Sequence, residues 1–220
     1  MIAGYPSPAG GKEYAVGFDR RRAHRVLVLP ALFDEANKLR HFTIEVLRAL
    51  DVVGIDGFLP DLPGCNESLA ALEGQSLASW LLAAEAAAHH FGATAAVSIR
   101  GGALCLPPML PVIRYAPVIG ASVLRGLLRA RVIASKESGR PESSERLASQ
   151  GRRDGLELAG YHLGPQMIAD LETAEPAGGA SITEITQSDV GGPGLWLRVE
   201  PDHNPAQAAR LASLIGAALA

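Results

Sequence analysis

The stretch VSIRGGAL, residues 97–104, joins a short apolar run to two glycines and a second apolar run. This is the pattern of a buried strand, a sharp turn and a helix, the geometry on which many enzymes mount a nucleophile within G-x-S-x-G. Here Ser98 stands at the first glycine of that motif and Arg100 stands at the serine. A guanidinium stays protonated and cannot attack a carbonyl. Three interpretations are open: an enzyme that has lost its nucleophile, an enzyme that works by other means, or a different fold.

A candidate base and a candidate acid lie near the end of the chain. His203 is a lone histidine between the last apolar segment and the C-terminal helix, and it is the candidate general base. Glu184 or Asp189 would be the acid that orients it. The alternative for His203 is an exposed loop residue near a helix N-cap. The alternative for Asp189, which lies in a glycine-rich loop, is an aspartate that forms a turn.

Other reactive side chains have simpler explanations. Cys65 would need a lowered pKa to act as a thiolate, and no residue near it in the sequence supplies one, so a small, partly buried cysteine is the favoured interpretation. Ser68 fits the cap of a short helical turn. Cys105 is expected in the core, and His89 and His90 at a helix end are expected to interact with its terminal carbonyls.

Alternating strands and helices must position these residues. Strands are predicted over 13–18, 24–33, 55–64 and 94–99, and helices over 37–54 and 76–92. Ser76 and Gly92 are the candidate caps of the second helix. The alternation predicts a doubly wound, mostly parallel sheet with helices on both faces. Because ligands bind beyond the carboxyl ends of such strands, the loops after residues 30, 60 and 99 should carry the site.

Beyond residue 106 the pattern becomes less regular. Further strands are predicted over 111–120, 180–186 and 194–200, and helices over 121–137, 164–175 and 204–220. Asn204 is the candidate N-cap of the last helix, with Pro205 in its first turn. The polar segment 138–155 is expected to be exposed and mobile. We interpret residues 121–175 as a helical insertion, a lid, within a single domain that spans residues 1–220.

The composition is that of a compact domain: 220 residues, 48% hydrophobic and 20% charged, with a formal net charge of −3. This balance argues against a nucleic-acid partner. Two unrelated cysteines favour a reducing compartment. We expect no signal peptide and no integral membrane segment, and therefore a cytoplasmic protein. The histidines lack metal-ligand spacing, so no metal and no cofactor are expected, and a homodimer is left open.

Several segments together resemble a known family. They are LPALFDEANKLRHF (29–42), DLPGCNES (61–68), SIRGGAL (98–104), YAPVIGASVLRGLLRARV (115–132) and LELAGYHLGP (156–165). Over about residues 24–165 the chain is similar to the exosortase A system-associated hydrolases, and more similar to the second of their two branches. That family belongs to the α/β-hydrolase fold and is found with bacterial exopolysaccharide and protein-sorting loci.

The resemblance implies an α/β-hydrolase-like fold with a helical lid. It also implies that an arginine at the elbow is part of the branch's pattern, and that His203 lies where the fold keeps its catalytic histidine. The ligand site would include Phe33, Asn37, Lys38 and Cys65, from the segments that carry the resemblance. No substrate follows from these motifs.

The fold hypothesis leads to a prediction for Arg100. The segment ALFDEANK would face the elbow, and a guanidinium beside the positive end of its own helix needs an anion. Left unpaired, a buried guanidinium would destabilise the fold by several kcal/mol. We therefore predict an ion pair between Arg100 and Glu35 or Asp34. The alternative is that Arg100 and the backbone N–H groups at Gly101 hold an anionic group of a ligand.

Two hypotheses for function follow. The first is a hydrolase that acts on an ester or acyl group in exopolysaccharide-related metabolism, with a small-molecule or glycan-derived substrate. Activated water or an unexpected side chain would be its nucleophile, and His203 would be its base. The second is a non-catalytic relative that uses the former active site to bind an anionic metabolite or a partner protein.

Overall fold

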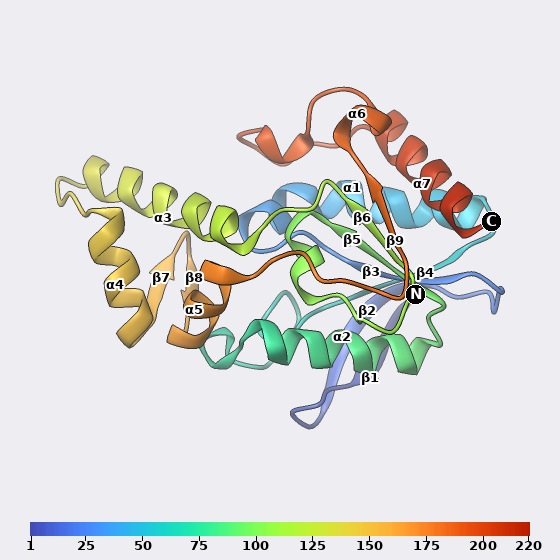
Figure 1. Ribbon diagram of the computed structural model, residues 1–220, viewed down its shortest axis with the longest axis horizontal. Helices are drawn as coiled ribbons and strands as arrows, with labels where there is room; N and C mark the ends of the chain where they lie inside the picture. Colours follow the sequence, from blue (N-terminus) through green and yellow to red (C-terminus); the bar gives the residue numbers. More distant parts are fainter.

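In the computed structural model, which describes residues 1–220, one sheet lies between two layers of helices (Figure 1). Its strands, in the order in which they lie across the sheet, are β1 (Ile2–Pro6), β2 (Lys12–Phe18), β4 (Asp56–Pro60), β3 (Arg25–Leu29), β5 (Ala95–Ile99), β6 (Val112–Tyr115) and β9 (Ile182–Ile185). The strands from β4 to β9 are parallel, and β1 and β2 are antiparallel. The predicted fold class, a mostly parallel sheet in an α/β-hydrolase-like arrangement, is confirmed.

Three long helices cover the two faces of the sheet. α1 (Asp34–Val52) and α7 (Pro205–Leu219) pack together on one face, and α2 (Leu77–Phe91) covers the other (Figure 1). Each face has its own hydrophobic cluster, because strands buried on both sides send successive side chains to opposite layers. No helix of the chain is both long enough and apolar enough to cross a bilayer.

Local capping signals explain where two of these helices begin and end. The Ser76 side chain accepts from the N–H of Ser79, which closes a capping box at the start of α2, and Gly92 ends that helix with φ of 60°. The side chain of Asn204 accepts from the first N–H groups of α7, directly before Pro205. These caps confirm the predicted boundaries.

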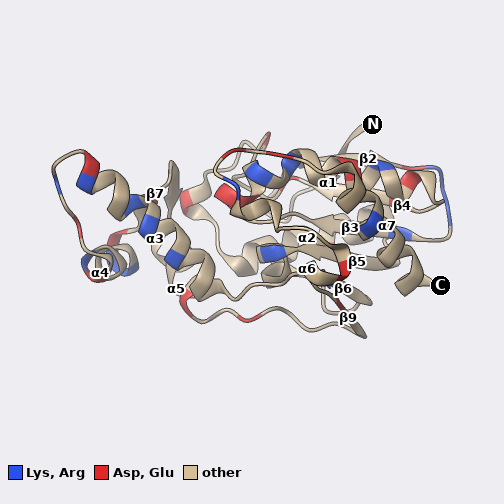
Figure 2. Cartoon of the chain, turned by 90° about the horizontal axis from the view of Figure 1, so that it is seen from above, with Lys and Arg blue, Asp and Glu red and all other residues tan.

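The segment between β6 and β9 forms an arm, defined here as residues 120–173. It contains α3 (Gly120–Glu137), α4 (Ser144–Asp154), the hairpin of β7 (Leu156–Leu158) and β8 (Tyr161–Leu163), and α5 (Pro165–Thr173). The arm extends away from the carboxyl ends of the strands, and Figure 2 shows it from a second direction. It occupies the region expected as a helical lid, with a β-hairpin that the prediction lacks.

The polar segment 138–155 was predicted to be exposed and mobile, but most of it forms a helix. It contains α4, whose first turn is capped by the side chain of Ser143. Leu147 is buried, and Gly151 lies so close to Ile168 that a Cβ there would be 2.6 Å from its Cδ1 atom. A short apolar stripe buried against α5 therefore stabilises a helix in an otherwise polar sequence.

The prediction of a strand at 194–200 is also wrong. Only the 3₁₀ helix Leu195–Leu197 forms there, and the sheet ends at β9. The connection from β9 contains only the four-residue helix α6 (Gln187–Val190), which is shorter than the crossover that a further parallel strand needs. The helix predicted after the elbow is likewise a 3₁₀ helix, Arg100–Cys105, because two prolines follow it closely.

Candidate functional site

The elbow predicted at residues 97–104 is present. β5 leads directly into Arg100, whose φ of 54° lies in the left-handed region that residues other than glycine rarely adopt. The chain then enters the 3₁₀ helix Arg100–Cys105. Glycine is required in this turn, because a Cβ on Gly102 would lie 2.4 Å from the carbonyl oxygen of Pro30. The elbow is therefore in close contact with the loop that follows β3.

Arg100 is held by three segments of the chain. Its Nε and Nη2 donate to the two carboxylate oxygens of Glu35, each at 3.0 Å, in a bidentate ion pair. Its Nη1 donates to the carbonyl of Ala116 at 3.1 Å, and its guanidinium carbon lies 4.2 Å from the ring centroid of Trp196. The side chain of Arg100 is only 15% exposed. The predicted pairing of Arg100 with Glu35 is confirmed.

The position of Glu35 suits both partners. Glu35 lies in the first turn of α1, where the helix dipole favours a carboxylate. Its charge compensates a largely buried guanidinium beside the amino end of a 3₁₀ helix. Three of the five guanidinium N–H groups donate to the protein. The other two leave open the alternative of an anionic ligand on Arg100, which stays a prediction.

The loop between β3 and α1 offers free hydrogen-bond donors. Phe33, directly before α1, has φ of 54° and ψ of −127°, a strained conformation that persists only where the surrounding structure enforces it. The backbone N–H groups of Leu32 and Phe33 donate to no other group of the protein. Gly101 packs on the Leu32 side chain, so these amides lie close to the elbow. Free amides beside an elbow can bind a carbonyl or carboxylate oxygen.

One cavity, which we call the α3 cavity, lies between this loop and the arm. Its volume is about 320 Å³. The loop and the start of α1 line it through Phe33, Asp34, Glu35 and Lys38, and α3 lines the opposite wall. Arg100 is not among the lining residues, because it lies behind Glu35 and the Trp196 ring.

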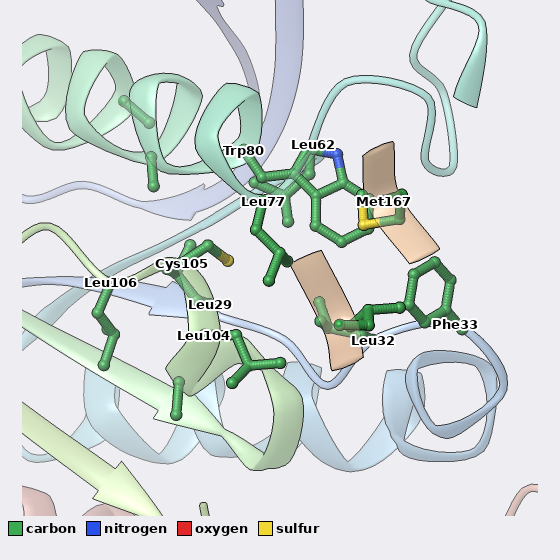
Figure 3. Packing of buried hydrophobic residues seen from close by; sticks show 14 of the residues in the cluster. Leu29, Leu32, Phe33, Leu62, Leu77, Trp80, Leu104, Cys105, Leu106 and Met167 are labelled. Atoms are coloured by element: carbon green, nitrogen blue, oxygen red, sulfur yellow. The ribbon is translucent and has the colours of Figure 1, made fainter. Parts of the chain in front are cut away.

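A second cavity, the aromatic cavity, lies on the other side of Phe33 and has a volume of about 380 Å³. Its walls include Phe33, Trp80 and Tyr161, with ring centroids 5.6 Å apart for Phe33–Trp80 and 5.5 Å apart for Phe33–Tyr161. Asn37 Nδ2 donates to the Tyr161 hydroxyl at 2.8 Å. Figure 3 shows Phe33 with Trp80, Leu32 and Met167 in the adjoining hydrophobic cluster. Both cavities share Leu32, Phe33 and Ala159.

The residues predicted for ligand binding gather around these two cavities. Phe33 lines both. Asp34 and Lys38 line the α3 cavity together with Glu35, and Lys38 Nζ lies 2.8 Å from a carboxylate oxygen of Asp34. Asn37 and Cys65 line the aromatic cavity. The structure therefore brings together side chains from the β3–α1 loop, from the start of α1 and from the loop after β4, as expected for one sheet edge. Their roles toward a ligand stay predictions.

Cys65 is not prepared for nucleophilic attack. Burial raises the pKa of its thiol to about 12, with smaller contributions from the carboxylates of Asp61 and Glu13. The thiolate population near neutral pH is therefore negligible. Burial also raises the pKa of Cys105 to about 12, and that residue lies in the core.

His203 and Asp189 are not in contact with each other. The His203 ring is exposed and stacks on His41 of α1, with centroids 3.9 Å apart. Asp189 accepts hydrogen bonds from the side chain and the backbone N–H of Thr186 at the start of α6, and these bonds lower its pKa. Glu184, the other candidate acid, pairs with Arg114. Neither carboxylate contacts His203.

Sequence reasoning missed three residues that shape the site. Trp196 was interpreted as a strand residue, although it is one of only two tryptophans in the chain. Tyr161 lies in the segment 156–165, which contributed to the family resemblance, and that resemblance could have pointed to it as a site residue. Ala116 acts through its backbone carbonyl, so its residue type carries no signal. Nowhere in the chain do three or more His, Cys, Asp or Glu side chains gather as metal ligands would.

Comparison with known proteins establishes the fold. No protein-family model and no curated protein sequence matches this chain. Est1E from Butyrivibrio proteoclasticus, solved with bound ferulic acid, is 12% identical, with a TM-score of 0.60 over 98% of this chain and 99% of that chain. Alpha/beta hydrolase domain-containing protein 10 from mouse is 10% identical, with a TM-score of 0.54 over 100% and 98%.

A third similar structure is the bottromycin epimerase BotH in complex with bottromycin A2. It is 14% identical, with a TM-score of 0.53 over 100% of this chain and 99% of that chain. At these identities the likeness concerns the fold alone, and the chain has the α/β-hydrolase fold. Because one fold supports different chemistries, the activity must be argued from the site.

Proposed function

We propose that this protein binds an organic ligand with a carbonyl or carboxylate group in the two cavities beside Phe33, without covalent chemistry at the elbow. The observation that carries the proposal is the bidentate pair between Arg100 and Glu35. The side chain at the elbow is committed to the protein itself. Its function is then to support the wall of the site.

The chemistry of arginine favours this structural role for Arg100. A guanidinium is protonated at all physiological pH values, so Arg100 can act neither as a base nor as a nucleophile. Moving it toward a ligand would break the pair with Glu35, the bond to the Ala116 carbonyl and the contact with the Trp196 ring. Each of those partners is itself held by a different element of the fold.

The surroundings support a binding site. Cavities of about 320 and 380 Å³ are at the small end of the range of about 300–1,000 Å³ that is typical of ligand pockets. Hydrophobic residues form more than half of each lining, and Leu32 and Phe33, whose N–H groups are free, line both cavities. An apolar body with one oxygen acceptor is the ligand that such a lining favours.

A second candidate function is hydrolysis of an ester or acyl group in exopolysaccharide-related metabolism, in the cytoplasm and without a cofactor. The observation that favours it is the same pair of free amides, since they would stabilise the oxyanion of a tetrahedral intermediate. Water would be the nucleophile and His203 the base, with Asp189 as its partner. Both side chains would have to leave their present contacts with His41 and Thr186.

Ester turnover separates the two functions. A panel of p-nitrophenyl esters is assayed with the wild-type chain, Arg100→Ala and His203→Ala. Binding without chemistry predicts no turnover that depends on either residue. A wild-type rate that falls 100-fold or more in His203→Ala would reject our proposal in favour of hydrolysis.

Binding is measured through the tryptophans, because Trp80 lines the aromatic cavity and Trp196 the α3 cavity. In Trp196→Phe, energy transfer from Trp80 to 8-anilinonaphthalene-1-sulfonate, an anionic aromatic probe, reports on the aromatic cavity. Ala36→Leu, which narrows that cavity, should weaken the probe's affinity about 10-fold. Ala217→Leu, on the exposed face of α7, is the matched control. Equal affinity in both variants would contradict the site.

A further inference from the structure

We propose that the α3 cavity binds a single-chain anionic amphiphile, with the hydrocarbon chain along α3 and the anionic head group at Arg129. This inference rests on the proposed binding function and names the ligand class of one of its two cavities. It concerns the cavity wall that α3 forms, which lies apart from the elbow.

The shape of the cavity is elongated. α3 lines it from Ser122 to Ile133, a distance of about 16 Å along a helix that rises about 1.5 Å per residue. Small residues, Ser122, Gly126 and Ala130, recur once per turn on this face. A Cβ at Gly126 would have no atom within 4 Å, so the middle of the wall is open space. The result is a trough parallel to the helix axis.

Apolar side chains form more than half of the lining of this trough. Val123, Leu127 and Ile133 of α3 line one side, and Leu32, Phe33 and the Trp196 ring line the other. An extended hydrocarbon chain advances about 1.25 Å per carbon, given bonds of about 1.5 Å. The trough therefore accommodates a chain of about a dozen carbons.

One of the charged residues that line the cavity is a cation without a partner. Asp34 is compensated by Lys38, whose Nζ lies 2.8 Å away, and Glu35 is compensated by Arg100. The fourth charged lining residue, Arg129, makes no ion pair and no side-chain hydrogen bond. A ligand with one negative charge would complete the balance.

A neighbouring arginine adds positive charge beside Arg129. Arg125, one turn before Arg129 on α3, is also exposed and without an ion pair, and two like charges at this spacing are unfavourable in an isolated helix. Glu145 and Glu172 line the groove on the far side of these arginines, but neither lies within 4.0 Å of them. The unpaired arginines fit the head group of a carboxylate or a phosphate monoester.

The test uses dodecanoate, below its critical micelle concentration, with the full-length chain. Titration calorimetry on the wild type measures affinity, and Trp196 fluorescence in Trp80→Phe reports whether the ligand enters the α3 cavity. Gly126→Leu fills the trough at a position with free space and favours the helix, and it should weaken binding at least 10-fold. Gly126→Ala, the graded control, should change affinity less than threefold.

The head-group assignment has its own test. Arg129→Gln should weaken dodecanoate binding about 10-fold and leave dodecanol unaffected, and dodecyltrimethylammonium should not bind the wild type. Arg140→Gln removes the same charge from an exposed site on the arm and should match the wild type. Equal affinity for dodecanoate and dodecanol would overturn the role of Arg129.

Two results would overturn the whole inference. One is dodecanoate binding that Gly126→Leu does not weaken. The other is a pair of observations: free dodecanoate does not bind, and the protein sediments with phosphatidylglycerol vesicles equally well with and without Gly126→Leu. The arm would then adsorb to a lipid surface instead of binding a single amphiphile. If dodecanoate fails but the aromatic probe still binds near Trp80, only the amphiphile inference is lost. If neither probe binds, the proposed function is lost as well.

Discussion

Both ends of the sheet hold arginines against carboxylates, but the two sites are built differently. At the amino ends of the strands, the fully buried side chain of Asp56 accepts from the backbone N–H groups of Arg20 and Arg22, each at 3.0 Å, and from Nη1 of Arg25 at 2.8 Å. At the carboxyl ends, Arg100 pairs with Glu35, and Glu35 also lines a cavity. At the amino end, the Asp56 carboxylate fixes the backbone at Arg20 and Arg22 to the start of β4. At the carboxyl end, the Arg100–Glu35 pair borders a cavity instead.

The backbone differs in degree. Phe33, Arg100 and Ala116, all at the carboxyl ends, have φ values of 54°, 54° and 45°, whereas Arg21, with φ of 59°, is the one such residue other than glycine at the amino end. Conformations of this kind are strained by about 1–3 kcal/mol each and concentrate at functional sites. The same ion-pair chemistry therefore stabilises the fold at one end and holds a strained, hollow region in place at the other.

The largest expected effect is at the amino end. Asp56→Ala removes the common acceptor of two backbone N–H groups and of the guanidinium groups of Arg22 and Arg25, so the free energy of unfolding should fall by about 3–5 kcal/mol. Urea denaturation measures this change. Asp202→Ala, at an exposed pair with Arg198, is the control and should change stability by less than about 0.5 kcal/mol. A loss at Asp56 no larger than the control's would remove the contrast between the two ends.

A smaller effect is expected for the carboxyl-end pair, because its side chains retain some contact with water. Glu35→Gln and Arg100→Met should each lower the free energy of unfolding by about 2 kcal/mol, and the double variant should lose less than their sum. The double-mutant cycle should give a coupling of about 1–2 kcal/mol. Strict additivity would mean that the two side chains are neighbours without energetic consequence.

The two ends should also respond to acid in opposite directions. Hydrogen bonds from Arg25 lower the pKa of Asp19 to about 2, and those from Arg20 lower the pKa of Asp51 to about 2, whereas burial raises the pKa of Asp61 at the carboxyl end. Unfolded aspartates have a pKa of about 3.9. The stability that Asp19 and Asp51 contribute is therefore complete above that pH and is lost as the pH falls toward 2. The contribution of Asp61 has the opposite sign and favours the folded state as the pH falls.

Unfolding free energies between pH 6 and pH 2.5 test this contrast. Asp51→Asn should flatten the decline at low pH relative to the wild type, and Asp61→Asn should steepen it. Parallel curves for the two variants would show that the ends do not differ in their proton linkage.

The smallest effect concerns a hairpin turn. Ala159 and Gly160 connect β7 to β8 with φ values of 52° and 82°, a turn that favours Asn-Gly. Ala159→Asn should therefore stabilise the protein by about 0.5–1 kcal/mol. Arg21→Asn, at the amino end with φ of 59°, should give a similar gain. Only Ala159→Asn should also alter probe affinity, since Ala159 lines both cavities.

Elements with strong local signals could be predicted from the sequence. α2 and α7 carry their caps in the residues Ser76, Gly92 and Asn204, and β5 is a continuous apolar run. The pairing of Arg100 with Glu35 was predictable because a buried cation needs an anion and the expected fold places the segment ALFDEANK opposite the elbow. The caps and the strand depend on residue type and on short-range sequence distance, whereas the pairing also needs the fold, because Arg100 and Glu35 lie 65 positions apart in the chain.

The remaining features depend on packing between distant segments. α4 is stabilised by the contact of Gly151 with Ile168, which a polar sequence does not reveal. The alternation in residues 194–200 is that of a strand, but the chain from β9 is too short to add one, and Trp196 packs on Arg100 instead. His203 and Asp189 were grouped by chain order alone, and chain order does not determine that His203 stacks on His41.

The base of the arm has an evolutionary consequence. The N–H of Gly120 donates to the carbonyl of Ala174 at 2.8 Å, so the chain enters and leaves the arm at one point, and the flanking strands β6 and β9 pair directly. A segment with adjoining ends can be lengthened, shortened or exchanged without redirecting the strands beside it. Residues 120–173 can therefore change in length or sequence while β6 and β9 keep their direct pairing.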